Sequence, residues 1–151
     1  MTVPLGRRME RVSERLIAEA EAKWRAAQIE GYHITVDVIR GSDVRRNDVT
    51  VHRGAIIYAT VRYRESDGRF GEPRELTTAQ AEPFTIEGLF ELLRDEMLRS
   101  GRIEIRVERS GTPPLPRTIE LGPLLRKGKV VPDTAVLIHI VRFEQEGITP
   151  S

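Results

Sequence analysis

The stretch IEGLFELLRDEMLRSGRIEIRV, residues 86–107, combines an amphipathic helix and a strand with almost no linker between them. Its first apolar residues recur at helical spacing, at Ile86, Leu89, Phe90, Leu93 and Met97. Beyond Ser100 and Gly101 the apolar residues alternate instead, at Ile103, Ile105 and Val107. We therefore predict a helix, capped by Thr85, that ends at Gly101 and leads directly into a half-buried strand.

The same pattern occurs once earlier in the chain. From Met9 onward, apolar residues recur at helical spacing, at Val12, Leu16, Ala20, Trp24 and Ala27. Gly31 suits the left-handed conformation that ends a helix, and residues 33–40 then alternate as a strand does. Two such helix-plus-strand units can place two helices on one antiparallel sheet.

Further strands are predicted where apolar residues alternate or run together. Residues 49–63 read as a hairpin with its turn at Arg53-Gly54, residues 117–121 as a short strand and residues 134–144 as a central strand. Residues 41–48, 65–83 and 122–133 carry turn residues and charge and read as loops. We predict an α+β fold: an antiparallel sheet of about five or six strands with two helices on one face, in the order α-β-β-β-α-β-β-β.

Composition fits a single domain with an ordinary globular balance. Hydrophobic residues make up 39% of the 151 residues and charged residues 31%. We predict a flexible N-terminal arm at residues 1–8, one domain at residues 9–144 and a flexible tail at residues 145–151. The 24 basic and 23 acidic residues nearly cancel, so no nucleic-acid partner is expected.

The chain has no cysteine, which excludes disulfides, thiolate catalysis and thiolate zinc sites. No apolar run is long enough to span a bilayer, so no membrane span is expected. The polar N-terminus lacks a signal-peptide apolar region. The sequence as it stands is therefore expected to be cytoplasmic, or exported or envelope-associated if a leader has been trimmed from it.

Few residues have a pattern that points to chemistry. The three histidines, His33, His52 and His139, lack the spacing of metal ligands, so no metal or cofactor is predicted. No serine lies in a nucleophile elbow, and no catalytic residue is predicted. His139 interrupts an apolar strand, where a hydrogen-bonded structural role is favoured over a catalytic one.

Aromatic residues offer a second set of candidates. Rings lining a pocket between helices and sheet could bind a ligand, although filling of the core is the favoured interpretation. The candidate ligand-binding residues are therefore Tyr32, Tyr58, His139 and Trp24.

Three hypotheses for function follow. The leading one is a non-catalytic binding or accessory domain, whose partner, a protein or a small molecule, meets the other sheet face or residues 65–83. An alternative is a small hydrolase or isomerase-like enzyme with a pocket between helices and sheet, using His139 and Tyr32 as acid and base. A second alternative is a self-associating module, a homodimer through an edge strand.

A series of short motifs also occurs in a set order over residues 19–144. The motifs are Trp24 with Ile29 and Tyr32, Val49-Thr50-Val51 with Gly54, Thr85-Ile86 with Leu89-Phe90, Pro116 with Ile119-Glu120-Leu121, and Asp133. In these motifs the chain resembles an uncharacterised bacterial family, domain of unknown function six-one-seven-four. Members of that family often carry export signals and cysteines after the first strand, which this sequence lacks. Since the family has no established activity, the resemblance implies no catalytic residues.

Overall fold

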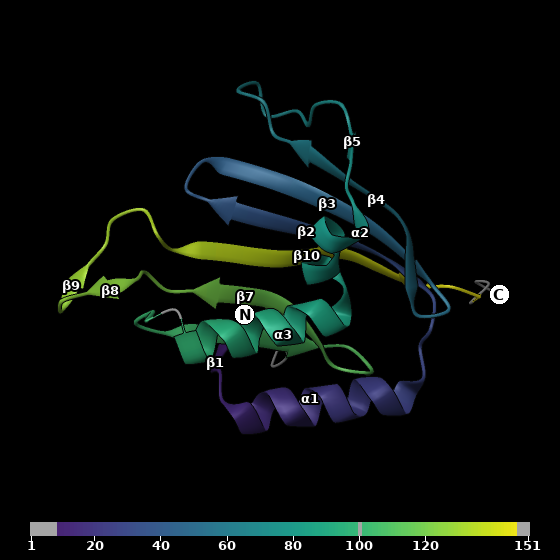
Figure 1. The fold of residues 1–151 in the computed structure, drawn as a ribbon, viewed down its shortest axis with the longest axis horizontal. Helices are drawn as coiled ribbons and strands as arrows, with labels where there is room; N and C mark the ends of the chain where they lie inside the picture. Colours follow the sequence, from purple (N-terminus) through teal and green to yellow (C-terminus); the bar gives the residue numbers. More distant parts are fainter. Residues whose placement is uncertain (1–8, 100, 148–151) are drawn as a thin grey trace, which may run out of the picture.

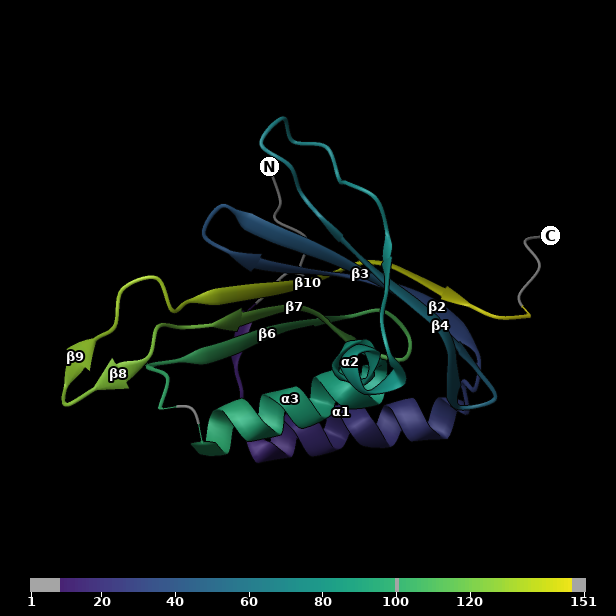
Figure 2. The same ribbon diagram turned by 45° about the horizontal axis from the view of Figure 1, so that its top comes forward.

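The computed structural model describes residues 9–99 and 101–147 of the chain. Two long helices, α1 (Glu14–Ala27) and α3 (Ile86–Arg99), lie on the same face of one large sheet (Figures 1 and 2). A short helix, α2 (Thr78–Ala81), and one 3₁₀ turn (Glu82–Phe84) lead into α3. The predicted α+β class, with helices on one face of an antiparallel sheet, is confirmed.

The sheet has eight strands, and all its neighbouring strands are antiparallel. Their order across the sheet is β1-β6-β7-β10-β2-β3-β4-β5. The bounds are β1 Met9–Arg11, β2 Tyr32–Arg40, β3 Asp43–His52, β4 Ala55–Tyr63, β5 Arg74–Glu75, β6 Ile105–Ser110, β7 Leu115–Leu121 and β10 Val136–Gln145. Strand β10 lies centrally, between β7 and β2, as its apolar sequence predicts. A separate hairpin consists of β8 (Leu125–Arg126) and β9 (Lys129–Val130).

The predicted number of strands, five or six, the predicted number of helices, two, and the predicted element order are wrong in detail, since α2 is a third helix in the described chain. The structure adds β1, β5, β8 and β9, each only two or three residues long. Such short segments show no periodicity, because a distant partner decides whether they pair: β1 exists through its pairing with β6. For the same reason the first helix begins at Glu14 rather than Met9, after Ser13 caps it by accepting a hydrogen bond from the Leu16 amide at 3.1 Å.

Residues 41–48, predicted as a loop, form a tight turn and the first half of β3. Gly41, at φ 59°, permits the turn, and Asp43 already pairs with Arg40. The polar residues are compatible with a strand because the sheet face away from the helices is open. On that face Arg46 donates two hydrogen bonds to Asp37, both 2.9 Å long.

The end of α1 also differs from the prediction. The left-handed residue is Gln28, at φ 51°, and not Gly31. Gly31 lies beside the Glu146 side chain instead: a Cβ there would lie 2.2 Å from its carboxylate, whose flexible end would have to move. The backbone amide of Glu146 donates to the Gly31 carbonyl at 2.9 Å, so the chain beyond β10 returns to the α1–β2 connection. Residues 1–8 and 148–151, parts of the predicted arm and tail, lie outside the described residues.

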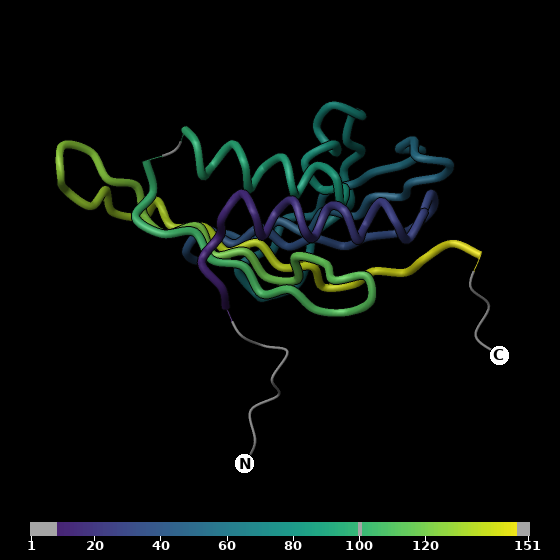
Figure 3. The backbone as a smooth tube through the Cα atoms, turned by 90° about the horizontal axis from the view of Figure 1, so that it is seen from below, coloured from purple at the N-terminus to yellow at the C-terminus, as the bar shows by residue number. Residues whose placement is uncertain are grey.

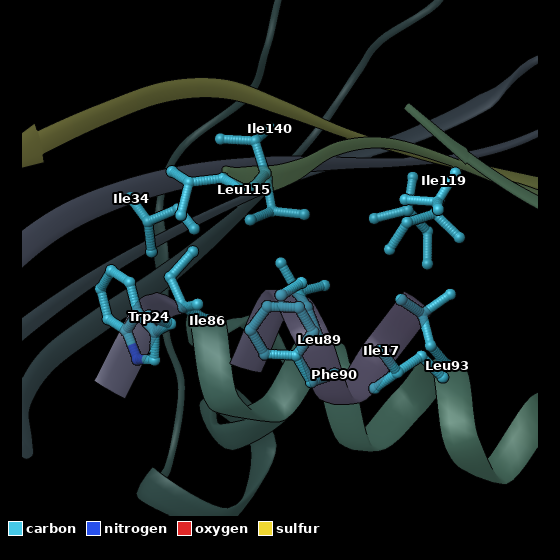
Figure 4. Packing of buried hydrophobic residues seen from close by; sticks show 14 of the residues in the cluster. Ile17, Trp24, Ile34, Ile86, Leu89, Phe90, Leu93, Leu115, Ile119 and Ile140 are labelled. Atoms are coloured by element: carbon cyan, nitrogen blue, oxygen red, sulfur yellow. The ribbon is translucent and has the colours of Figure 1, made fainter. Parts of the chain in front are cut away.

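The core fills the space between the helix layer and the sheet (Figure 4). Ile17 and Trp24 of α1 lie beside Leu89, Phe90 and Leu93 of α3, beneath the strand residues Ile34, Leu115, Ile119 and Ile140. All of these side chains are buried. The predicted apolar face of residues 86–97 therefore forms one wall of this core.

One arginine joins the two long helices. Arg94 of α3 donates to Glu14 of α1 at 3.0 Å and also hydrogen-bonds Glu21 of α1. Glu21 is largely buried, and the hydrogen bond from Arg94 lowers the pKa of its carboxyl group below the ordinary value of 4.5. The charged form of Glu21 is thus part of what holds α1 against α3.

We expect Glu21→Gln to lower the free energy of unfolding by about 1.5–3 kcal/mol at neutral pH. Because the folded-state pKa is depressed, this contribution is complete above the ordinary pKa and is lost as pH falls through the folded-state value. Urea unfolding should therefore show wild type and variant converging in acid. Glu19→Gln, which removes only an exposed pair with Arg15, is the control, and equal losses in the two variants would contradict the assignment.

Candidate functional site

A pocket of about 330 Å³ opens between the sheet and the segment from α2 to α3. Its volume lies at the lower end of the range of small-molecule sites, ~300–1,000 Å³. The pocket follows from the arrangement of the helices: α3 packs against β7, whereas the four-residue helix α2 packs against β4. Part of the helix-side face of β2, β3 and β4 is therefore left open as a hollow.

The floor of the pocket is apolar. It is built from strand residues that face the helices and from residues of the α2–α3 segment: Val38, Val61, Leu121, Val136, Ile138, Leu76, Phe84 and Leu92. Of the strand residues, Val38, Leu121, Val136 and Ile138 belong to the core cluster, so the floor is a continuation of the core surface. An apolar ligand fragment placed there would lose water on most sides.

One buried amide lies in this apolar surface. Asn47 of β3 is only 4% exposed, and its Nδ2 donates to the Val36 carbonyl at 3.2 Å. Its Oδ1 accepts no hydrogen bond from any described residue. Every fully buried side-chain oxygen in the described chain has a hydrogen-bond partner, so Oδ1 is not fully buried. Oδ1 is therefore open to the pocket and can accept a hydrogen bond from a ligand.

Two arginines line the mouth of the pocket, and one of them, Arg40, is an uncompensated positive charge within the described chain. Arg40 ends β2 and forms no ion pair or hydrogen bond with any residue that the structure describes. Arg45 of β3 lies 3.4 Å from Asp43, with its guanidinium 5.2 Å from the centre of the Tyr63 ring. Both side chains are placed to meet an anionic group.

A third arginine, Arg102, forms a wall of the pocket, and its side chain is held by hydrogen bonds within the protein. Its side chain is 9% exposed, and its Nε donates to Glu96 of α3 at 2.7 Å. Its Nη1 donates to the carbonyls of Gly122 and Thr134 at 2.9 and 2.6 Å. Glu96 is the one carboxylate among the lining residues, and it pairs with Arg102. Since Arg45 pairs with Asp43, Arg40 sets the charge of the mouth.

Trp24 and Tyr32, two of the predicted ligand-binding residues, lie together but outside this pocket. Their ring centres are 5.5 Å apart in an edge-to-face arrangement. The Trp24 indole and the Tyr32 hydroxyl both donate to Glu87 of α3, at 2.9 and 3.3 Å. Burial raises the pKa of Tyr32, whose oxygen also accepts from the Ile86 amide at 3.0 Å. This cluster joins β2 and α1 to the first turn of α3.

Tyr58 and His139, the other two predicted residues, lie on the opposite face of the sheet. Tyr58 is 57% exposed, and His139 is exposed with its Nδ1 3.0 Å from Thr118 Oγ1. The four predicted residues therefore do not form one site. His33 and His52 each meet a carboxylate, Asp48 at 3.4 Å and Glu146 at 2.8 Å. Across the described residues, no three His, Cys, Asp or Glu side chains are grouped as metal ligands.

Comparisons with known proteins give no family assignment. No protein-family model matches the chain, and a search of curated proteins finds no match either. The resemblance to domain of unknown function six-one-seven-four therefore stays a prediction. Over residues 9–99 and 101–147, no helix is long and apolar enough to cross a membrane.

The sequence reasoning missed the polar residues of the pocket. Arg45 and Asn47 fell in a segment interpreted as a loop, although they continue the alternation of Val49 and Val51 backwards along one face. Extending this alternation backwards from Val49 to the next two residues on the same face would have identified Asn47 and Arg45. Nothing local marks Arg102, because its partners lie 6, 20 and 32 residues away along the chain.

Proposed function

We propose that this protein is a non-catalytic binding domain whose pocket takes a small molecule with an apolar body and an anionic head. The observation that carries the proposal is Arg40, a cation with no partner among the described residues, at the mouth of a hollow with an apolar floor. A carboxylate between Arg40 and Arg45 would form charge-assisted hydrogen bonds, each contributing about 1.5–3 kcal/mol. Each methylene buried on the floor would add about 0.8 kcal/mol.

The lining residues favour binding over catalysis. None of the residues that line the pocket is a serine, cysteine, histidine or lysine, and its one carboxylate faces Arg102. His139 and Tyr32, the acid and base of the enzyme alternative, do not line the pocket.

Titration calorimetry with octanoate tests the proposal. We expect saturable binding of octanoate to the full chain and much weaker binding of 1-octanol, which has the same chain without the charge. Arg40→Gln should weaken octanoate binding by about tenfold, since one charge-assisted hydrogen bond is lost. Leu92→Trp should abolish binding by filling the pocket from α3.

Arg62→Gln is the matched control. Arg62 lies opposite Arg46 in the β3–β4 ladder, on the sheet face away from the helices, and does not line the pocket. The substitution should leave the octanoate affinity unchanged. Equal binding of octanoate and 1-octanol, or an affinity that neither Arg40→Gln nor Leu92→Trp alters, would overturn the proposal.

A further inference from the structure

The β8–β9 hairpin projects from the main sheet and carries both basic and apolar side chains. Its residues do not line the pocket. The hairpin extends beyond the end of the main sheet, past the C-terminal end of α3 (Figures 1 and 3). Its two-residue turn is Lys127-Gly128, with φ of 51° and 74°, the two positive values that a type I′ turn requires. The projection is therefore a defined hairpin and not an irregular loop.

The hairpin has a cationic pair and an apolar pair. Leu125 lies directly opposite Val130, so these two side chains share one face. Arg126 lies opposite Lys129 on the other face, and Lys127 is at the tip. Leu125 is 40% and Val130 54% exposed, so the apolar pair is open to solvent.

Backbone hydrogen bonds join the base of the hairpin to the segment between α3 and β6. The Ile103 amide donates to the Pro123 carbonyl at 3.0 Å, and the Leu125 amide donates to the Gly101 carbonyl at 3.0 Å. Ile103 is 45% exposed, and Leu98, near the end of α3, is 73% exposed. Four of the seven large hydrophobic residues that are exposed in the described chain, Leu98, Ile103, Leu125 and Val130, thus belong to the hairpin or to the segments leading to it.

We infer that this hairpin docks the protein on an anionic membrane surface. No acidic residue occurs between Pro123 and Pro132, so Arg126, Lys127 and Lys129 meet negative lipid headgroups without competition inside the hairpin. When the hairpin enters the headgroup region tip first, both of its faces meet lipid, so Leu125 and Val130 supply the second requirement for interfacial binding, apolar side chains, on the face opposite Arg126 and Lys129. A nucleic-acid surface fits less well, because it would leave the aliphatic pair without a partner and the hairpin has no aromatic ring to stack on bases.

Co-sedimentation with vesicles tests the inference. The full chain should bind vesicles of phosphatidylcholine mixed with phosphatidylglycerol, bind phosphatidylcholine alone much more weakly, and be released by salt. Lys127→Asn combined with Lys129→Gln should weaken binding by about fivefold per cation, roughly 25-fold for the pair. Asparagine keeps the positive φ of the turn. Leu125→Ser combined with Val130→Ser should weaken binding to the same vesicles at unchanged charge.

Arg53→Asn combined with Arg62→Gln is the matched control. It removes two positive charges, one of them from an Arg53-Gly54 turn whose φ values, 50° and 77°, match those of the hairpin. The inference is overturned by absence of vesicle binding, by equal losses in control and hairpin variants, or by a serine pair that binds like wild type. Tighter, hairpin-dependent binding to a single-stranded or duplex oligonucleotide than to the vesicles would also overturn it.

Discussion

Phe90→Ala is expected to lower the free energy of unfolding by about 3–5 kcal/mol. Phe90 is 2% exposed and lies in the core where α3 meets α1 and the sheet (Figure 4). Truncation removes a large apolar surface from the core and leaves a cavity, because neighbours on two helices and several strands cannot all move inward. A loss of this size is a large share of the ~5–15 kcal/mol that stabilises an ordinary domain.

Urea unfolding followed by circular dichroism measures the effect. Leu98→Ala is the matched control: it lies on the same helix, it is 73% exposed, and its truncation should change the free energy of unfolding by less than about 0.5 kcal/mol. If Phe90→Ala unfolds at the same urea concentration as Leu98→Ala, α3 does not pack on the sheet through this face.

The contrast between Phe90 and Leu98 shows what a sequence period can predict. Helical spacing predicts which face of residues 86–97 is buried, and the burial of Leu89, Phe90 and Leu93 confirms it. The same reasoning predicts the buried Ile34, Val36 and Val38 of β2. It also predicts the cap at Thr85, whose Oγ1 accepts from the Gly88 amide at 3.0 Å. These features depend on neighbours a few residues apart, which a single sequence shows.

Features set by distant partners could not be predicted in this way. The three-residue strand β1 depends on β6, almost a hundred residues later in the chain. The pocket depends on how far α2 and α3 extend over the sheet, which no local pattern records. His139 illustrates the limit: its sequence neighbours predict a central strand, but only the open face of the sheet explains why its ring is exposed.

Arg102→Met is the second change for which we expect a large effect, a loss of about 3–5 kcal/mol in the free energy of unfolding. Methionine approximates the length of the side chain but donates no hydrogen bond. The carbonyls of Gly122 and Thr134 would lose their arginine donor, and Glu96 would lose the cation that lies 2.7 Å from it. Since Arg102 is also a wall of the pocket, binding of octanoate should be lost with it.

Two further variants separate the charge from the geometry. Arg102→Lys keeps the positive charge but cannot reach three acceptors at once, so its stability should fall between wild type and Arg102→Met. Arg106→Met is the control, because Arg106 is exposed on the open face beside Glu104, at 3.0 Å, and should change stability little. If Arg102→Met unfolds at the same urea concentration as Arg106→Met, Arg102 does not hold α3 to the loops that follow β7 and precede β10. If Arg102→Met is destabilised while its affinity for octanoate stays at the wild-type value, the ligand does not lie against Arg102.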